Sequence, residues 1–174
     1  MKRYVALLRG INVGGKNRLP MADLRDYVAA LGGTEITTYI QSGNVVFSHP
    51  DCDPVAWSGA LAGAIGVRAG FAPKVLVLPA MEFQAAVSRS PFVPGNPKDL
   101  HLYFLTGAPT KPDLARANAS AIAGEEFAIM GRVFYLHAPD GIARSKLAAQ
   151  VERIMGLPAT ARNWRSVQAI LALI

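Results

Sequence analysis

The sequence is short of cysteine, of charge and of long hydrophobic runs. Cys52 is its only cysteine, so no disulfide can form within the chain, and we expect a reducing, cytoplasmic setting. No run reaches the roughly 18 apolar residues of a membrane-spanning helix. The apolar stretch 4–8 is too short for a signal peptide. We therefore expect no membrane partner.

Charged residues make up only 17% of the 174-residue chain, whereas hydrophobic residues make up 51%. That balance argues for a packed globule and against disorder. The spacing of the three histidines, His49, His101 and His137, does not match that of metal ligands. The sequence also shows no pattern typical of a catalytic carboxylate pair or of a histidine–nucleophile pair. We therefore expect no metal and no cofactor, and it stays open whether the chain is an enzyme.

Acidic residues are missing from residues 1–22, which carry five bases. Residues 141–174 also carry five bases, with Glu152 as their one acid. The two ends therefore hold charges of +5 and +4, although the whole chain has a net charge of only +6. This distribution indicates either ordinary solubility or an anion-facing surface assembled from both ends of the chain.

Hydrophobic periodicity and turn residues predict the order β-α-β-β-α-β twice along the chain. In the first half we expect strands at 3–8, 36–41, 45–48 and 74–78 and helices at 20–31 and 53–65. In the second half we expect strands at 100–105, 127–130, 133–137 and 159–161 and helices at 113–121 and 145–155. A connecting helix at 80–88, a turn-rich linker at 90–99 and a final helix at 165–174 complete the chain.

This order is that of the split βαβ, or ferredoxin-like, unit. The predicted fold class is therefore α+β, with two tandem ferredoxin-like (βαββαβ) lobes plus a C-terminal helix. We expect the first lobe at 1–79, a connecting helix and linker at 80–99, and the second lobe with the C-terminal helix at 100–174. The lobes are expected to form one compact unit, and a monomer is favoured although the oligomeric state is open.

The stretch from Gly10 to Lys16 has the glycine and lysine spacing of a phosphate-binding P-loop, with Asn17 in place of Ser or Thr. A P-loop lysine lies in the first turn of a helix, but Pro20 would then fall inside that helix. This argues against a nucleotide-hydrolysing P-loop. What remains is a basic, glycine-rich loop, which is either an anion-binding nest or a mobile, solvated connection.

Two helices are predicted to begin among cations, where the helix dipole favours anions. Ser145 is the expected N-cap of one and Asn163 the expected N-cap of the other. The flanking cations are Arg144, Lys146, Arg162 and Arg165. Each such cation lowers the stability of the helix by only a few tenths of a kcal/mol when it is exposed. Beside a bound anion, the same cation would stabilise the complex. A Ser145–Lys146 catalytic dyad is disfavoured, because adjacent helical residues point in different directions.

Several stretches together resemble the domain of unknown function 1697 family of small bacterial proteins. They are YVALLRGINVGGKNRLPMADLRDYVAALG, TYIQSGNVVF, SPF, SKL and ARNWRSV. The resemblance covers nearly the whole chain and implies an α+β fold with two ferredoxin-like lobes, while no activity is established for the family. Its motif positions are here Arg9, Gly10, Asn12, Gly14, Gly15, Tyr39, Gln41, Ser42, Gly43, Asn44, Ser145, Lys146, Arg162, Asn163 and Trp164.

Two details of the motifs bear on their meaning. Ala161 stands where the family commonly has a second Thr, which removes one possible hydroxyl contact. A two-residue hairpin would by itself explain Gly43 and Asn44, because both tolerate positive φ. Such a hairpin does not require Gln41 or Ser42, so these two are better candidates for ligand contacts.

The leading hypothesis is a cytoplasmic protein that binds a phosphate-bearing or other anionic ligand in a basic cleft between the lobes. The expected ligand-binding residues are Arg9, Asn12, Gly14, Gly15, Lys16, Gln41, Ser42, Ser145, Lys146, Arg162, Asn163 and Trp164. Trp164 is interpreted either as packing or as a stacking platform for a flat ligand group. The alternatives are a nucleic-acid-binding module and an interaction or assembly protein that docks through the apolar residues 167–174. No catalytic residue is assigned.

Overall fold

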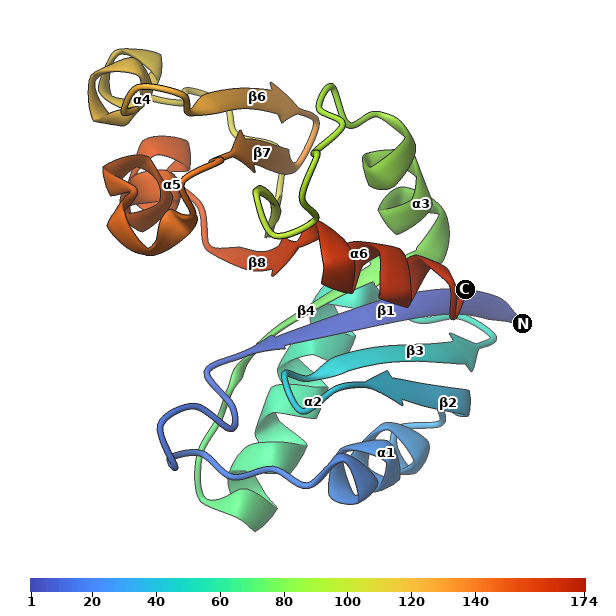
Figure 1. The fold of residues 1–174 in the computed structure, drawn as a ribbon. Helices are drawn as coiled ribbons and strands as arrows, with labels where there is room; N and C mark the ends of the chain where they lie inside the picture. The colour runs from blue at the N-terminus through green and yellow to red at the C-terminus, as the bar shows by residue number, and fades with distance from the viewer. The chain divides into compact units, whose positions relative to one another are not determined.

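The computed structural model describes all residues, 1–174, and its elements follow the predicted order (Figure 1). Six α-helices and two four-stranded antiparallel sheets make a mixed α+β fold, as predicted. Contacts divide the chain into two units, residues 1–85 with 169–174 and residues 86–168. The chain passes from one unit to the other within α3 (Ala80–Ser88) and again within α6 (Trp164–Leu171). None of the helices combines the length and apolarity that a membrane crossing requires.

The first unit contains a sheet with the strand order β2-β3-β1-β4. Its elements are β1 (Lys2–Arg9), α1 (Met21–Ala30), β2 (Thr34–Tyr39), β3 (Asn44–His49), α2 (Pro54–Ala69) and β4 (Lys74–Pro79). Helix α2 runs four residues beyond its predicted end at Ile65. It ends at Gly70, which adopts the left-handed conformation (φ 77°) that commonly closes a helix.

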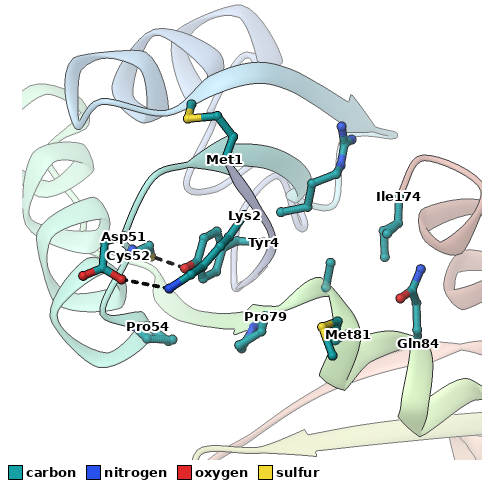
Figure 2. Close-up of a pocket in the computed structure, with 12 residues that line it drawn as sticks. Met1, Lys2, Tyr4, Asp51, Cys52, Pro54, Pro79, Met81, Gln84 and Ile174 are labelled. Atoms are coloured by element: carbon teal, nitrogen blue, oxygen red, sulfur yellow. Dashed lines mark hydrogen bonds and ion pairs between the residues drawn. The ribbon is translucent and has the colours of Figure 1, made fainter.

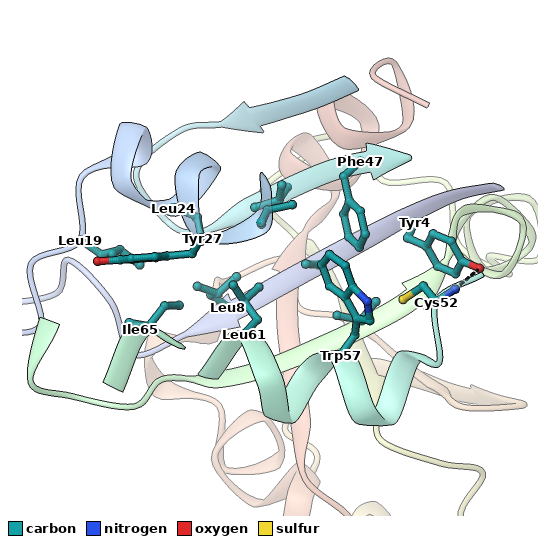
Figure 3. Packing of buried hydrophobic residues seen from close by; sticks show 14 of the residues in the cluster. Tyr4, Leu8, Leu19, Leu24, Tyr27, Phe47, Cys52, Trp57, Leu61 and Ile65 are labelled. Atoms are coloured by element: carbon teal, nitrogen blue, oxygen red, sulfur yellow. Dashed lines mark hydrogen bonds between the residues drawn. The ribbon is translucent and has the colours of Figure 1, made fainter. Parts of the chain in front are cut away.

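The core of the first unit lies between one face of this sheet and helices α1 and α2 (Figure 3). Alternate residues of β1, namely Tyr4, Ala6 and Leu8, point into it, as the two-residue period of a strand requires. Phe47 stacks on Tyr4 and on Trp57 of α2, with ring centroids 5.7 and 4.6 Å away. The aromatic stack therefore ties the two central strands to α2.

The second unit repeats this arrangement with the strand order β6-β7-β5-β8. Its elements are β5 (Leu100–Leu105), α4 (Leu114–Ser120), β6 (Glu126–Met130), β7 (Val133–His137), a 3₁₀ turn (Ile142–Arg144), α5 (Lys146–Met155) and β8 (Ala159–Asn163). Leu147, Val151 and Ile154 form the buried face of α5, as their helical spacing predicts. The short strand predicted at 159–161 is confirmed and extends to Asn163.

The connection between β2 and β3 differs from the two-residue hairpin that the Gly-Asn pair predicts. Tyr39 pairs with Asn44, so residues 40–43 form the loop, and φ is positive at Ile40 (48°) and Gly43 (76°). Asn44 lies inside β3, where its amide donates to the Tyr39 carbonyl and the Ser42 hydroxyl at 3.0 and 2.9 Å. The prediction was wrong because Asn44 closes the loop from the strand instead of occupying the turn.

Replacing Leu61 by alanine should lower the free energy of unfolding by about 2–5 kcal/mol, because it leaves a cavity in the core. Leu61 is fully buried in α2. The matched control is Val67→Ala on the same helix, where the side chain is 88% exposed and a change within about 0.5 kcal/mol is expected. Urea unfolding followed by circular dichroism measures both, and equal losses would contradict the placement of this core.

Candidate functional site

The glycine-rich loop after β1 is built around a tight turn. Val13 and Lys16 form an isolated bridge, in which the Lys16 N–H donates to the Val13 carbonyl at 3.0 Å. Between them lie Gly14 (φ 59°) and Gly15 (φ 74°). A two-residue turn with both central φ values positive is the arrangement that Gly-Gly suits best. The two glycines therefore shape the loop, and they hold Lys16 at its exposed tip.

The side-chain amide of Asn12 holds this loop in place. Its nitrogen donates to the carbonyls of Leu19 and Gln41 at 2.9 and 2.8 Å, and its oxygen accepts from the Leu19 N–H at 2.8 Å. Asn17 adds a second tie, since its side chain donates to the Gly10 carbonyl at 2.7 Å. Both N–H groups of the Asn12 amide are thus used within the protein.

Gly43 brings the neighbouring loop against the first one. Its carbonyl accepts from the Leu8 N–H at 2.8 Å, and its φ is 76°. A Cβ atom at this position would lie 2.6 Å from the Leu8 Cβ and 2.8 Å from the Ile11 Cδ1. Glycine is therefore required here both by the backbone conformation and by the close approach of β1. We call residues 9–18 and 40–43, together with Lys74, the two-loop surface.

The two-loop surface collects positive charge. Residues 9–18 and 40–43 contain no acid, and the exposed Lys16 and Arg18 form no ion pair. Across the β1–β4 ladder, Arg9 stands directly opposite Lys74, although like charges in that position repel. Asn12, Gly15, Arg18 and Gln41 line a hollow of about 440 Å³. The surface therefore offers cations and the Gln41 side-chain amide around a depression of ligand size.

In the second unit, Ser145 serves as the N-cap of α5, as predicted. Its buried hydroxyl accepts from the Ala148 N–H at 2.9 Å. This contact explains the serine without a nucleophilic role. Lys146 is exposed and lines an open groove of about 530 Å³ with Asp113, Arg116 and Gln150, among others.

The segment Arg162-Asn163-Trp164 joins β8 to α6. Asn163 is the N-cap of α6, as predicted, because its side-chain oxygen accepts from the Ser166 N–H at 2.9 Å. Arg162 lies opposite Leu102 in the sheet and donates to the Ala161 carbonyl at 2.8 Å. Burial lowers the pKa of the Arg162 guanidinium to about 10. Trp164 is half-buried at the first position of the helix.

The expected site residues thus fall into two sets, one in each unit. The first set, on the two-loop surface, is Arg9, Asn12, Gly14, Gly15, Lys16, Gln41 and Ser42; the second is Ser145, Lys146, Arg162, Asn163 and Trp164. The candidate list missed Arg18 and Lys74. Lys74 could have been found from the predicted sheet, because the start of an antiparallel β4 lies beside the end of β1. No group of three or more His, Cys, Asp or Glu side chains is placed to hold a metal ion.

Gly43→Ala should destabilise the protein more than Gly10→Ala. Both changes put a Cβ at positive φ, which costs about 1–2 kcal/mol. Only the Gly43 position is crowded, since a Cβ at Gly10 would meet nothing within 4 Å. Overpacking should therefore add about 1–3 kcal/mol at Gly43. Chemical denaturation of the two variants measures the difference, and equal stability would show that the two loops do not pack as described.

Comparison with known proteins places the chain in a family. A solved structure of the conserved bacterial protein SP0830 from Streptococcus pneumoniae is similar, with a TM-score of 0.70 and 22% sequence identity over 99% of this chain and 98% of that chain. At this identity the likeness shows the fold alone. No curated protein matches the sequence. The sequence model of DUF1697, a protein family of unknown function, matches residues 1–135, which include the whole two-loop surface, and the chain therefore belongs to this family.

Proposed function

We propose that the protein binds a phosphate-bearing or other anionic ligand at the two-loop surface. The observation that carries this proposal is the pair of unpaired cations, Lys16 and Arg18, on a loop whose backbone is fixed by Asn12 and Asn17. A fixed loop reduces the entropy that ligand binding must overcome. Gln41 lines the adjoining hollow and supplies an amide that can donate to a phosphate oxygen.

The charges of the surface set the kind of anion that suits it. An exposed ion pair contributes about 0.2–1 kcal/mol, so three or four such contacts contribute at most about 3–4 kcal/mol, which corresponds to a millimolar dissociation constant. A single phosphate would therefore bind weakly. A ligand with two or more phosphates engages Arg18 together with Lys16 or the Arg9–Lys74 pair, and it should bind more tightly for that reason.

In its full form the proposal includes the second unit. There Lys146, Arg162 and Asn163 form a second anion-binding surface, and each unit is a ferredoxin-like lobe. The strand orders β2-β3-β1-β4 and β6-β7-β5-β8, with helices packed on one sheet face of the first unit, support that lobe assignment.

The double variant Lys16→Ala/Arg18→Ala should weaken binding of pyrophosphate by about tenfold or more, since it removes two contacts of about 1 kcal/mol. The matched control is Lys98→Ala/Lys111→Ala, which removes the same charge from exposed positions of the second unit. Isothermal titration calorimetry at constant ionic strength measures both affinities. The control should retain the wild-type affinity.

Equal losses in the two double variants would show that only net charge matters, and this would contradict a site at the two-loop surface. The absence of binding by any phosphate, nucleotide or sugar phosphate would contradict the proposal as a whole. Arg162→Ala, measured in the same way after its folding has been checked by circular dichroism, tests the second unit. A loss of affinity supports anion binding by the second unit as well, and an unchanged affinity restricts the site to the first unit.

A nucleic-acid ligand is the second candidate, because the cations of the surface are spread over the end of β1, the glycine-rich loop and β4 and so could follow a phosphate backbone. Binding of a short single-stranded RNA should then weaken steeply with salt. In a plot of the logarithm of the binding constant against the logarithm of the salt concentration, the slope should fall in magnitude by roughly one for each phosphate contact that is lost in the Lys16→Ala/Arg18→Ala variant. Tight binding of mononucleotides with little gain from longer RNA would favour the small-molecule ligand instead.

A further inference from the structure

The first unit contains a second and larger hollow, of about 590 Å³, at the opposite end of β1 (Figure 2). Lys2, Arg3 and Tyr4 of β1 line it, whereas Arg9 at the other end of the strand belongs to the two-loop surface. Seven residue steps separate Lys2 from Arg9, which corresponds to about 23 Å along an extended strand. The hollow is therefore a separate feature from the proposed anion site.

The floor of this hollow is apolar and has no reactive side chain. Tyr4, Cys52 and Ala80 line it and are each less than 10% exposed. The Tyr4 hydroxyl accepts a hydrogen bond from the Cys52 backbone N–H at 3.3 Å, so this hydroxyl has a partner within the protein. Burial raises the pKa of the Cys52 thiol to about 11, so the sulfur stays a neutral thiol at neutral pH. The floor thus contains no charged side chain.

The rim of the hollow is adaptable and carries charges of both signs. Met1 and Met81 line it although they are 74% and 79% exposed, and Figure 2 shows both beside the hollow. Methionine is flexible and polarisable, which suits it to closing over apolar groups of different shape. The cation at the rim is already compensated, because Lys2 pairs with Asp51 at 3.1 Å.

Arg3 is the second side-chain cation of the lining, beside the N-terminal ammonium of Met1, and its Nε is buried without a hydrogen-bond partner. Its guanidinium donates to the Leu173 carbonyl at 2.7 Å and lies 3.7 Å from the Glu35 carboxylate. The Lys2 and Arg3 side chains therefore each have a carboxylate nearby within the protein that balances their charge. This distinguishes the hollow from the two-loop surface, where Lys16 and Arg18 have no such partner.

We propose that this hollow binds a neutral, apolar small molecule, such as an aromatic or alicyclic compound. Its volume lies within the roughly 300–1,000 Å³ that small-molecule sites occupy in proteins. Its buried floor and methionine rim provide apolar contact on several sides, and the compensated charges at its edge disfavour an ionic ligand. The site is independent of the proposed anion-binding function.

Nuclear magnetic resonance of methionine methyl groups tests the proposal with phenylnaphthylamine, a neutral aromatic probe. The chain has five methionines, of which only Met1 and Met81 line the hollow. We expect saturable shifts of the Met81 methyl signal, identified with the Met81→Leu variant. Met130 and Met155 belong to the second unit and serve as internal controls whose signals should stay in place.

The variant Met81→Asp puts a charge at the rim and should weaken probe binding by about tenfold or more, because a carboxylate would lose water when the probe covers it. Val93→Asp is the matched control, since Val93 is 95% exposed and lies outside the hollow. Probe fluorescence measures both affinities. The proposal is overturned if the probe does not bind, if it shifts Met130 or Met155 instead of Met81, or if both variants bind it equally.

Discussion

The geometry of the two-loop surface depends on the side-chain amide of Asn12. The chain between β1 and α1 has no strand or helix to satisfy its backbone groups, yet buried peptide groups need partners. Asn12 supplies them for both polar groups of Leu19, which is 1% exposed and packs in the core. The same amide binds the Gln41 carbonyl. One residue thus couples the core of the first unit, the glycine-rich loop and the neighbouring loop.

This surface also contains features that cost stability. Five residues between Gly10 and Asn17 have positive φ, and two of them, Asn12 and Asn17, are not glycines. Arg9 faces Lys74 across the ladder although like charges repel there. Strained backbone persists where a fold is held firmly by its surroundings, and it gathers at binding sites. That combination leads us to propose the two-loop surface as the main ligand site.

The regular elements could be predicted from the sequence because their signals are local. Helix α3 and strand β5 have the predicted ends, and the capping roles of Ser145 and Asn163 follow from residue type and position alone. The site could be predicted only in part. The Asn12–Gln41 contact joins residues 29 apart in the chain, and the crowding at Gly43 comes from the side chains of Leu8 and Ile11. Such contacts arise from tertiary packing, for which one sequence carries no periodic signal.

The central claim is that the two loops form a preformed, cation-bearing site. The most direct test is a titration with pyrophosphate followed through backbone amide chemical shifts. We predict saturable shifts at residues 9–18, 40–43 and 74, with the hydrogen-bonded amides of Asn12 and Leu19 protected from exchange both before and after binding. Rapid exchange of these two amides in the free protein, or shifts that leave both loops unchanged, would contradict the claim.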